Sequence, residues 1–140
     1  MSKEIRLDTV VKLKEREEER ARRELADATS VAVKAKEKVA QAHEAAMVEG
    51  PRKKVKAALW EMVELSHQRA LVQVAQAQAQ ANVANEGQEA ARLKHLAARG
   101  KAEAVRRAAS AKHEEADSED RRQERKVLDD VASVLFWRTA

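Results

Sequence analysis

Small apolar residues recur along this chain in alternating steps of four and three, and no other feature limits its fold as strongly. In the first third of the chain the repeat is interrupted only at two polar positions, Lys14 and Glu18. Its members are Leu7, Val11, Lys14, Glu18, Ala21, Leu25, Ala28, Ala32, Ala35, Val39, Ala42 and Ala46. A repeat of this kind places its members along one face of a helix and predicts a coiled coil. Because alanine holds so many of these positions, we expect two helix backbones to approach each other closely.

A second repeat follows in the remainder of the chain. Val55, Leu59 and Met62 are predicted to begin it, before a shift of phase. It continues with Ala70, Val74, Ala77, Ala81, Ala84, Gln88, Ala91, His95, Ala98, Ala102, Val105 and Ala109. Another apolar line accompanies it, formed by Val72, Ala75, Ala79, Leu93 and Ala97. Since one partner helix cannot cover both lines, the chain either forms three helical layers there or presents this face to another protein.

The two repeats are separated by Gly50-Pro51, the only place where the two helix-breaking residue types are adjacent. Glycine is favoured just after a helix, and proline is favoured in the first turn of the next one. The sequence therefore predicts an all-α fold, a long antiparallel two-helix coiled-coil hairpin that forms a single domain. The predicted bounds are a domain over 1–140, a helix over about 3–48, a turn over 49–52 and a helix over about 53–137.

The register of this hairpin is less constrained. Pairing of equal lengths from the turn matches residue 5 to about residue 97 and leaves about 40 residues overhanging. A bend near Gly87 or Gly100 would instead let the two termini meet. On the outer face of the first helix, we expect ion pairs between Glu18 and Arg22 and between Glu19 and Arg23.

Composition argues against an enzyme. The chain has no cysteine, which excludes disulfides and thiol catalysis. Four histidines are scattered without the i, i+4 spacing of a helical metal site, and no carboxylate lies in a strongly apolar segment. We therefore expect no catalytic residue, metal, cofactor or small-molecule substrate. No apolar run approaches the roughly 20 residues of a membrane span, which favours a cytoplasmic protein.

The distribution of charge leaves one other function open. Residues 51–112 carry 12 basic and 5 acidic groups, whereas residues 1–50 carry 11 of each. A basic helix can bind nucleic acid without sequence specificity. The chain has no aromatic residues interleaved with these cations, as base stacking would require. A generic coiled-coil scaffold with non-specific nucleic-acid affinity is the alternative function, and a solvated charged face is the simpler interpretation.

Two clusters combine apolar and charged side chains. The first follows the turn and consists of Trp60, Met62 and Val63 with Arg52, Lys53 and Lys54. The second lies near the C-terminus and consists of Arg121, Arg122, Arg125, Lys126, Phe136, Trp137 and Arg138. Each cluster has a structural alternative. In the first, Trp60 closes the end of the hairpin core. In the second, Asp117 pairs with Arg121 while Phe136 and Trp137 pack on Ile5 or Val10.

Three segments resemble the FliJ/YscO family of export stalk proteins. The segment LDTVVKLKEREEERARREL, over 7–25, is similar to the opening of FliJ-type proteins of flagella and of their YscO-type injectisome counterparts. Trp60 lies just after the turn, within KKVKAALWEMVELSHQ. RRQERKVLDDVA, over 121–132, is similar to a charged stretch near the family's C-terminus, with Glu124, Lys126, Asp129 and Asp130 in place. The resemblance covers nearly the whole chain and leaves the choice between a flagellar and an injectisome system open.

This resemblance implies a non-enzymatic stalk at the inner face of an export apparatus. Family members insert into the pore of the hexameric export ATPase, promote its assembly and activity, and contact the cytoplasmic domain of the export gate. Some also bind secretion chaperones, and contact with the membrane is only indirect. On this basis the C-terminal cluster is the candidate ATPase-binding site, and the cluster around Trp60 is the candidate gate-binding site.

Overall fold

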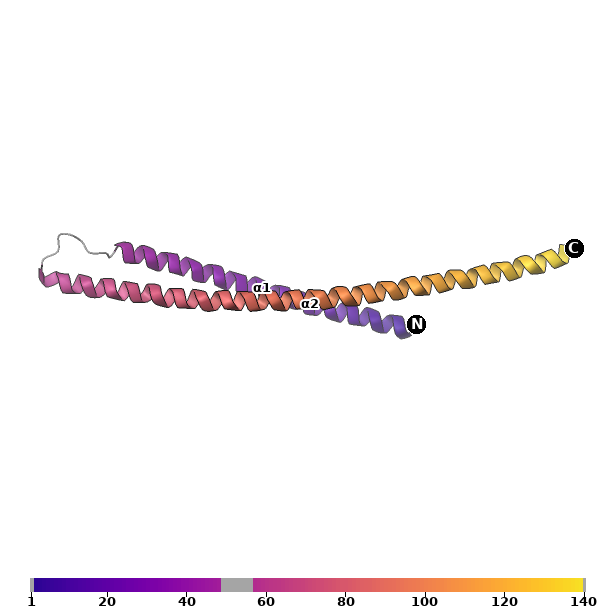
Figure 1. Ribbon diagram of the computed structural model, residues 1–140, viewed down its shortest axis with the longest axis horizontal. Coiled ribbons are helices and arrows are strands. Elements are labelled where there is room, and N and C mark those ends of the chain that lie inside the picture. Colours follow the sequence, from indigo (N-terminus) through magenta and orange to yellow (C-terminus); the bar gives the residue numbers. More distant parts are fainter. Residues whose placement is uncertain (1, 49–56, 140) are drawn as a thin grey trace. The chain divides into compact units, whose positions relative to one another are not determined.

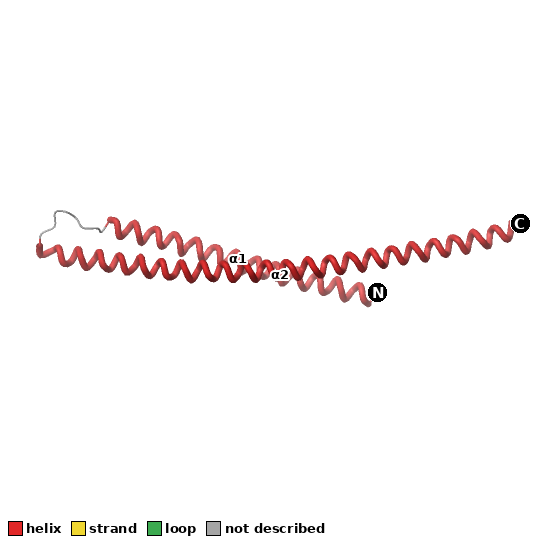
Figure 2. Tube along the Cα trace, in the orientation of Figure 1, coloured by secondary structure: helices red, strands yellow, loops and turns green. Residues whose placement is uncertain are grey.

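The computed structural model describes residues 2–48 and 57–139, and all of them are helical. Helix α1 spans Ser2–Val48, and helix α2 spans Ala57–Thr139 (Figures 1 and 2). The two helices pack against each other in antiparallel directions, which confirms the prediction of an all-α helical hairpin. The predicted turn over 49–52 and the predicted first residues of the second helix lie outside the described residues.

The chain divides into two compact units, each containing a part of both helices. The terminal unit comprises Met1–Glu18 and Ala98–Ala140, and the central unit comprises Glu19–Ala97. Each unit is a pair of antiparallel helical segments. A single domain over the whole chain stays a prediction.

The interface between the helices follows the predicted repeat. Each of the twelve repeat positions in α1, from Leu7 to Ala46, is buried or partly buried, and so is each of the twelve in α2 from Ala70 to Ala109. The fully buried residues of the described chain are all alanines: Ala21, Ala32, Ala46, Ala70, Ala81, Ala102 and Ala109. Because the side chain of alanine is a single methyl group, the opposite helix covers it only when the two backbones are close. The two helices are therefore held by a narrow line of small contacts, and not by a thick core.

Larger residues of the repeat are only half enclosed. Leu25 and Val39, which the sequence predicts to be buried, are partly exposed. Thr29 supports this region, because its Oγ1 donates to the Leu25 carbonyl at 2.8 Å and accepts from Gln88 Nε2 at 3.3 Å. A second helix can cover one side of a leucine, but nothing covers the other side.

The beginning of the repeat in α2 differs from the prediction. Leu59 and Met62, predicted to begin it, are exposed, and Val55 lies outside the described residues. Val63 and His67 are partly buried instead, and they precede Ala70 in steps of four and three. The repeat therefore keeps one phase from Val63 to Ala109, because a constant phase keeps a single face of α2 toward α1.

The predicted register is also wrong. Pairing from the turn would place Asp8 opposite residue 94, but Asp8 lies against His113, with 3.2 Å between Oδ1 and Nε2. In the central unit Thr29 contacts Gln88, whereas equal-length pairing would place it opposite residue 73. These polar contacts between the helices define the observed register in each unit.

One consequence is a shorter overhang within the terminal unit. Helix α1 begins six residues before Asp8, so it extends along α2 to about residue 119. The part of α2 beyond this point, about 20 residues rather than 40, has no helix beside it. Its side chains are exposed throughout, from Asp117 to Thr139.

Helix α2 continues through Gly87 and Gly100 without interruption, so neither glycine ends a helix, and a bend at either one stays a prediction. The second apolar line is not covered by a third layer, since Val72 and Leu93 are exposed.

Candidate functional site

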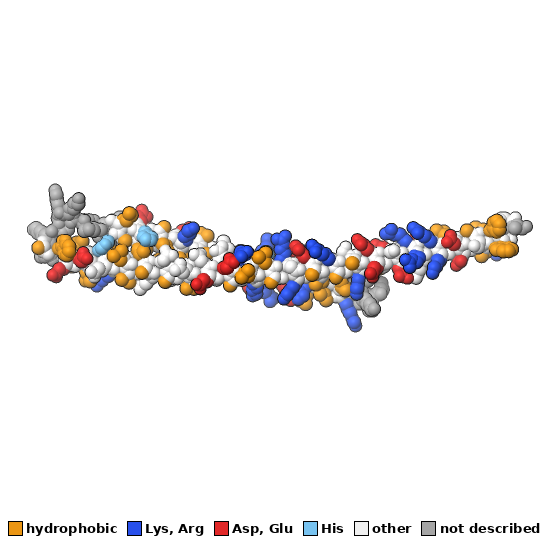
Figure 3. All heavy atoms as spheres, viewed as in Figure 1, with side chains coloured by type: hydrophobic (Ala, Val, Ile, Leu, Met, Phe, Trp, Pro, Cys, Tyr) orange, Lys and Arg blue, Asp and Glu red, His pale blue; other side chains and the backbone are white. Residues whose placement is uncertain are grey.

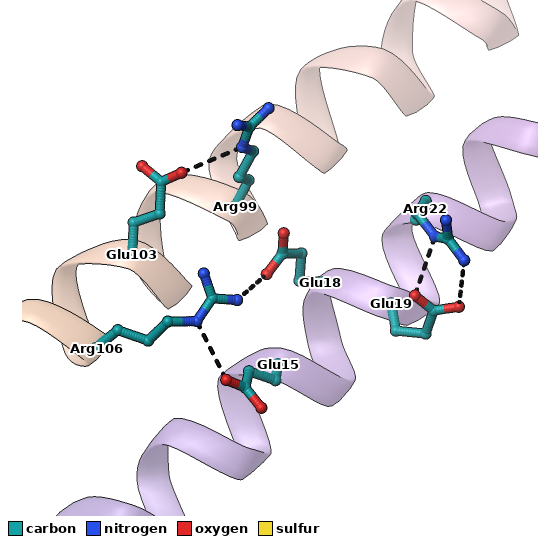
Figure 4. A network of polar contacts seen from close by, with 7 residues as sticks. All are labelled: Glu15, Glu18, Glu19, Arg22, Arg99, Glu103 and Arg106. Carbon is teal, nitrogen blue, oxygen red and sulfur yellow. Dashed lines mark hydrogen bonds and ion pairs between the residues drawn. The ribbon is translucent and has the colours of Figure 1, made fainter. Parts of the chain in front are cut away.

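The two polar positions that interrupt the repeat of α1 have partners that make their partial burial tolerable. Arg106 of α2 donates from Nε to Glu15 Oε1 at 3.1 Å and from Nη2 to Glu18 Oε2 at 2.7 Å (Figure 4). The Glu18 side chain is only 22% exposed. Lys14, the other interruption, donates to Glu17 at 3.1 Å on its own helix. Charged hydrogen bonds of this geometry are stronger than neutral ones, so Arg106 marks a defined position along the interface.

This arrangement corrects one predicted ion pair. Glu18 was expected to pair with Arg22, but its repeat position turns it toward α2, where Arg106 binds it. In the central unit Arg22 binds Glu19 at 3.0 Å, and Arg23 lies 3.5 Å from Glu19 as predicted. The hydrogen bond to Glu15, with a smaller contribution from the one to Glu18, raises the pKa of Arg106, and hydrogen bonding from Arg22 lowers the pKa of Glu19.

The C-terminal end of α2 forms an uncovered surface of the terminal unit. Phe136 is 70% exposed and Trp137 is 80% exposed. Five other apolar side chains precede them at helical spacing and are also exposed: Val127, Leu128, Val131, Val134 and Leu135. Figure 3 shows basic side chains followed by hydrophobic ones toward this end of the chain. A run of this length without a covering element is typical of a surface that meets another molecule.

The charged residues of the same end have no partners within the described chain. No side chain between Glu114 and Arg138 makes an ion pair in residues 2–48 and 57–139, and this includes the predicted pair of Asp117 with Arg121. Phe136 and Trp137 are too exposed to be packed on Val10, and the side chain of Ile5 lies outside the described part. The structure thus places Arg121, Arg122, Arg125, Lys126, Phe136, Trp137 and Arg138 together on one uncovered helix. Of the structural alternative for this cluster, neither the pair of Asp117 with Arg121 nor packing on Val10 is present in the described residues.

The cluster around Trp60 is only partly described. Trp60 is 53% exposed and Met62 is exposed, while Val63 is partly buried at the beginning of the interface. Arg52, Lys53 and Lys54 lie outside the described residues. Trp60 is therefore neither enclosed in the hairpin core nor fully free of it.

One surface feature was missed by sequence reasoning. In the terminal unit a shallow groove of about 390 Å³ is lined by Arg6, Leu7, Val10, Ala104, Val105 and Ala108. Its lining is almost entirely apolar. Val10, Ala104 and Ala108 lie beside the repeat and not on it, so the periodicity alone did not indicate them.

The described residues contain neither a metal-binding group nor a membrane-spanning helix. No three histidine or acidic side chains of that part of the chain converge as metal ligands would. None of its helices is both long enough and apolar enough to cross a bilayer.

Comparison with known families decides the relationship. The family described as flagellar FliJ protein matches residues 2–140, which is essentially the whole chain. This chain belongs to the FliJ family. Among curated proteins none matches it, and among solved structures none does either.

Membership of the FliJ family confirms the resemblance seen in the sequence and makes the chain a protein of the flagellar export apparatus. FliJ proteins are in general non-enzymatic. They act in protein complexes of export, so the exposed surfaces of this chain are best considered as contacts with other proteins. The individual partners of each surface are not assigned by membership alone.

Proposed function

We propose that this protein is the cytoplasmic stalk that couples the hexameric export ATPase to the export gate. The uncovered end of α2 enters the ATPase pore and promotes assembly and activity of the ring. The cluster around Trp60 contacts the cytoplasmic domain of the gate, and secretion chaperones are further partners. The observation that carries the proposal is the free end of α2, which combines unpaired cations with exposed aromatic residues in a FliJ-family chain.

The chemistry of this end suits a pore. Exposed cations contribute only about 0–1 kcal/mol each to an interaction, but they increase association rate and specificity. They can therefore orient a helix within a ring without holding it in one position. Phe136 and Trp137 supply the apolar area that charged contacts lack, and tryptophan is enriched among residues that dominate binding energy.

ATPase stimulation tests the first contact. Changing Arg121, Arg122 and Arg125 to alanine should reduce stimulation of a cognate export ATPase at least several-fold, and so should removal of residues 134–140. The matched control changes Lys34, Lys36 and Lys38 to alanine, because these exposed lysines of α1 carry the same charge and have no ion-pair partner in the described chain. If both C-terminal variants remain helical and stimulate as well as the control, this end does not bind the ATPase.

Binding to the isolated gate domain tests the second contact. Trp60→Ala should weaken gate binding while leaving the melting temperature nearly unchanged, because half of the side chain is already in solvent. Trp137→Ala is the matched control, since it removes the same residue type from the other surface. Equal loss of binding and of thermal stability in Trp60→Ala would identify a structural role instead.

The nucleic-acid alternative has little support in the structure. Four cations of the basic stretch are neutralised by carboxylates: Arg92 by Glu89, Lys94 by Glu24, Arg99 by Glu103 and Arg106 by Glu15 and Glu18. Cations that already have carboxylate partners release few counterions on binding a phosphate backbone. No second function is proposed.

A further inference from the structure

Charged residues of the terminal unit repeat at the same interval as its apolar interface. Along α2, Arg99, Arg106 and His113 are seven residues apart, and along α1 Asp8 and Glu15 are seven apart. In the structure His113 lies against Asp8, and Arg106 binds Glu15 and Glu18. Arg99 is left without a partner on α1 and binds Glu103 of its own helix at 3.2 Å.

The apolar contacts share this interval. Four repeat positions of α2 in this unit are buried or partly buried: Ala98, Ala102, Val105 and Ala109. Displacement by seven residues replaces Val105 with Ala98 and Ala109 with Ala102, and it puts His95 in the place of Ala102. The first two replacements keep a small apolar side chain at the interface. The third puts an imidazole ring at the most enclosed position, which is one reason why the observed register is preferred.

We propose that the two helices of the terminal unit have a second register one heptad away, in which Arg99 binds Glu15 and Glu18 and Arg106 binds Asp8. Within the terminal unit the number of cross-helix charged contacts is then preserved, because each cation takes the position of the next one. At about 1.5 Å per residue, the beginning of α1 moves by about 10 Å along α2. The uncovered end of α2 becomes seven residues longer.

Other contacts explain why the observed register is the preferred one. Arg99 must leave Glu103 before it can bind α1. If α1 moves as a whole, the central unit also loses the pair of Lys94 with Glu24 and the hydrogen bond of Gln88 with Thr29. These contacts are exposed or partly exposed, so they bias the equilibrium without preventing the exchange. The second register is a property of the hairpin alone and requires no partner.

The absence of cysteine makes the register directly measurable. Spin labels are attached to Arg16→Cys and Ser118→Cys in the full chain, at two exposed positions of the terminal unit. In the observed register Arg16 is opposite about residue 105, so the two labels are separated along the axis. Pulsed electron paramagnetic resonance should show a main distance and a minor one about 10 Å longer. A parent chain with only one distance overturns the proposal.

Two matched substitutions, seven residues apart, identify the contacts responsible. Arg106→Ala should increase the longer-distance population, because it removes two contacts, with Glu15 and Glu18, from the observed register and only one, with Asp8, from the second. Arg99→Ala should abolish that population, because it removes the corresponding partner in the second register only. Circular dichroism checks that each variant keeps its helix content. If both substitutions change the longer-distance population equally, the cations do not select the register and the proposal fails. If Arg106→Ala loses helix, the comparison of Arg99→Ala with the parent chain decides instead, and an unchanged longer-distance population overturns the proposal.

Discussion

Enlarging one buried alanine tests whether close approach of the helices sets the stability of the hairpin. Ala102 is the most enclosed residue described, with 1% of its surface exposed, and it lies in the α1–α2 interface of the terminal unit. Leucine at this position adds three carbon atoms where the opposite backbone leaves no room. If the helices could separate locally without cost, burial of these atoms would gain about 2 kcal/mol, at about 0.8 kcal/mol per carbon.

The expected result has the opposite sign. Overpacking of a well-packed interface costs about 1–3 kcal/mol, and here the strain extends along two stiff helices that must move apart. We expect Ala102→Leu to lower the free energy of unfolding by about 2 kcal/mol, which corresponds to a melting temperature lower by roughly 8 °C at about 4 °C per kcal/mol. Thermal unfolding followed by circular dichroism at the helix band measures this change.

The matched control is Ala90→Leu, on an exposed face of the same helix. Leucine and alanine both favour helices, so this change should stay within about 0.5 kcal/mol. If Ala102→Leu is as stable as Ala90→Leu, or more stable than the parent, close approach at Ala102 does not constrain the interface. The reasoning that attributes the alanine repeat to backbone proximity would then be refuted.

Three further outcomes follow from the contacts described. Leu25→Ala should cost about 1–2 kcal/mol in urea unfolding, less than for a fully buried leucine, because one side of Leu25 faces water; no measurable cost would mean that Leu25 contributes nothing to the interface. Glu18→Leu should raise the melting temperature by a few degrees, because an apolar side chain suits this repeat position better than a charged pair, and a large decrease would show that the contact with Arg106 outweighs packing. For Glu19, the hydrogen bond from Arg22 lowers the pKa, so the favourable contribution is complete above the ordinary glutamate pKa of about 4.3 and is lost as pH falls through the lower folded value. Nuclear magnetic resonance titration of Arg22→Gln should show the pKa of Glu19 returning toward its ordinary value, and an unchanged pKa would contradict this cause.

Much of the helical interface was predictable because the pattern that encodes it is local. Each of the twelve repeat positions of α1 and the twelve of α2 from Ala70 is on the interface, since heptad spacing alone determines which face of a helix is apolar. Family membership was equally accessible, because it rests on the order of segments along the chain.

The candidate surfaces were predictable as clusters of residues, but their exposure was not. Nothing in the sequence around Phe136 and Trp137 distinguishes an end that folds back on Val10 from one that remains uncovered. The groove beside Leu7 could not be predicted from the sequence either, because its walls come from two segments about 95 residues apart that only the fold brings together.

The sequence by itself therefore determined that the chain is helical, which faces meet, and that the contacts would be made by alanine. Only the tertiary structure decided the register, and with it the length of α2 that is left free for a partner. The physical reason is the repetition of the pattern, because alanine recurs at many interface positions and the spacing alone does not specify which heptads of the two helices pair. Long-range polar contacts such as Lys94 with Glu24 and Gln88 with Thr29 distinguish one heptad from the next, and they exist only once the two helices are side by side.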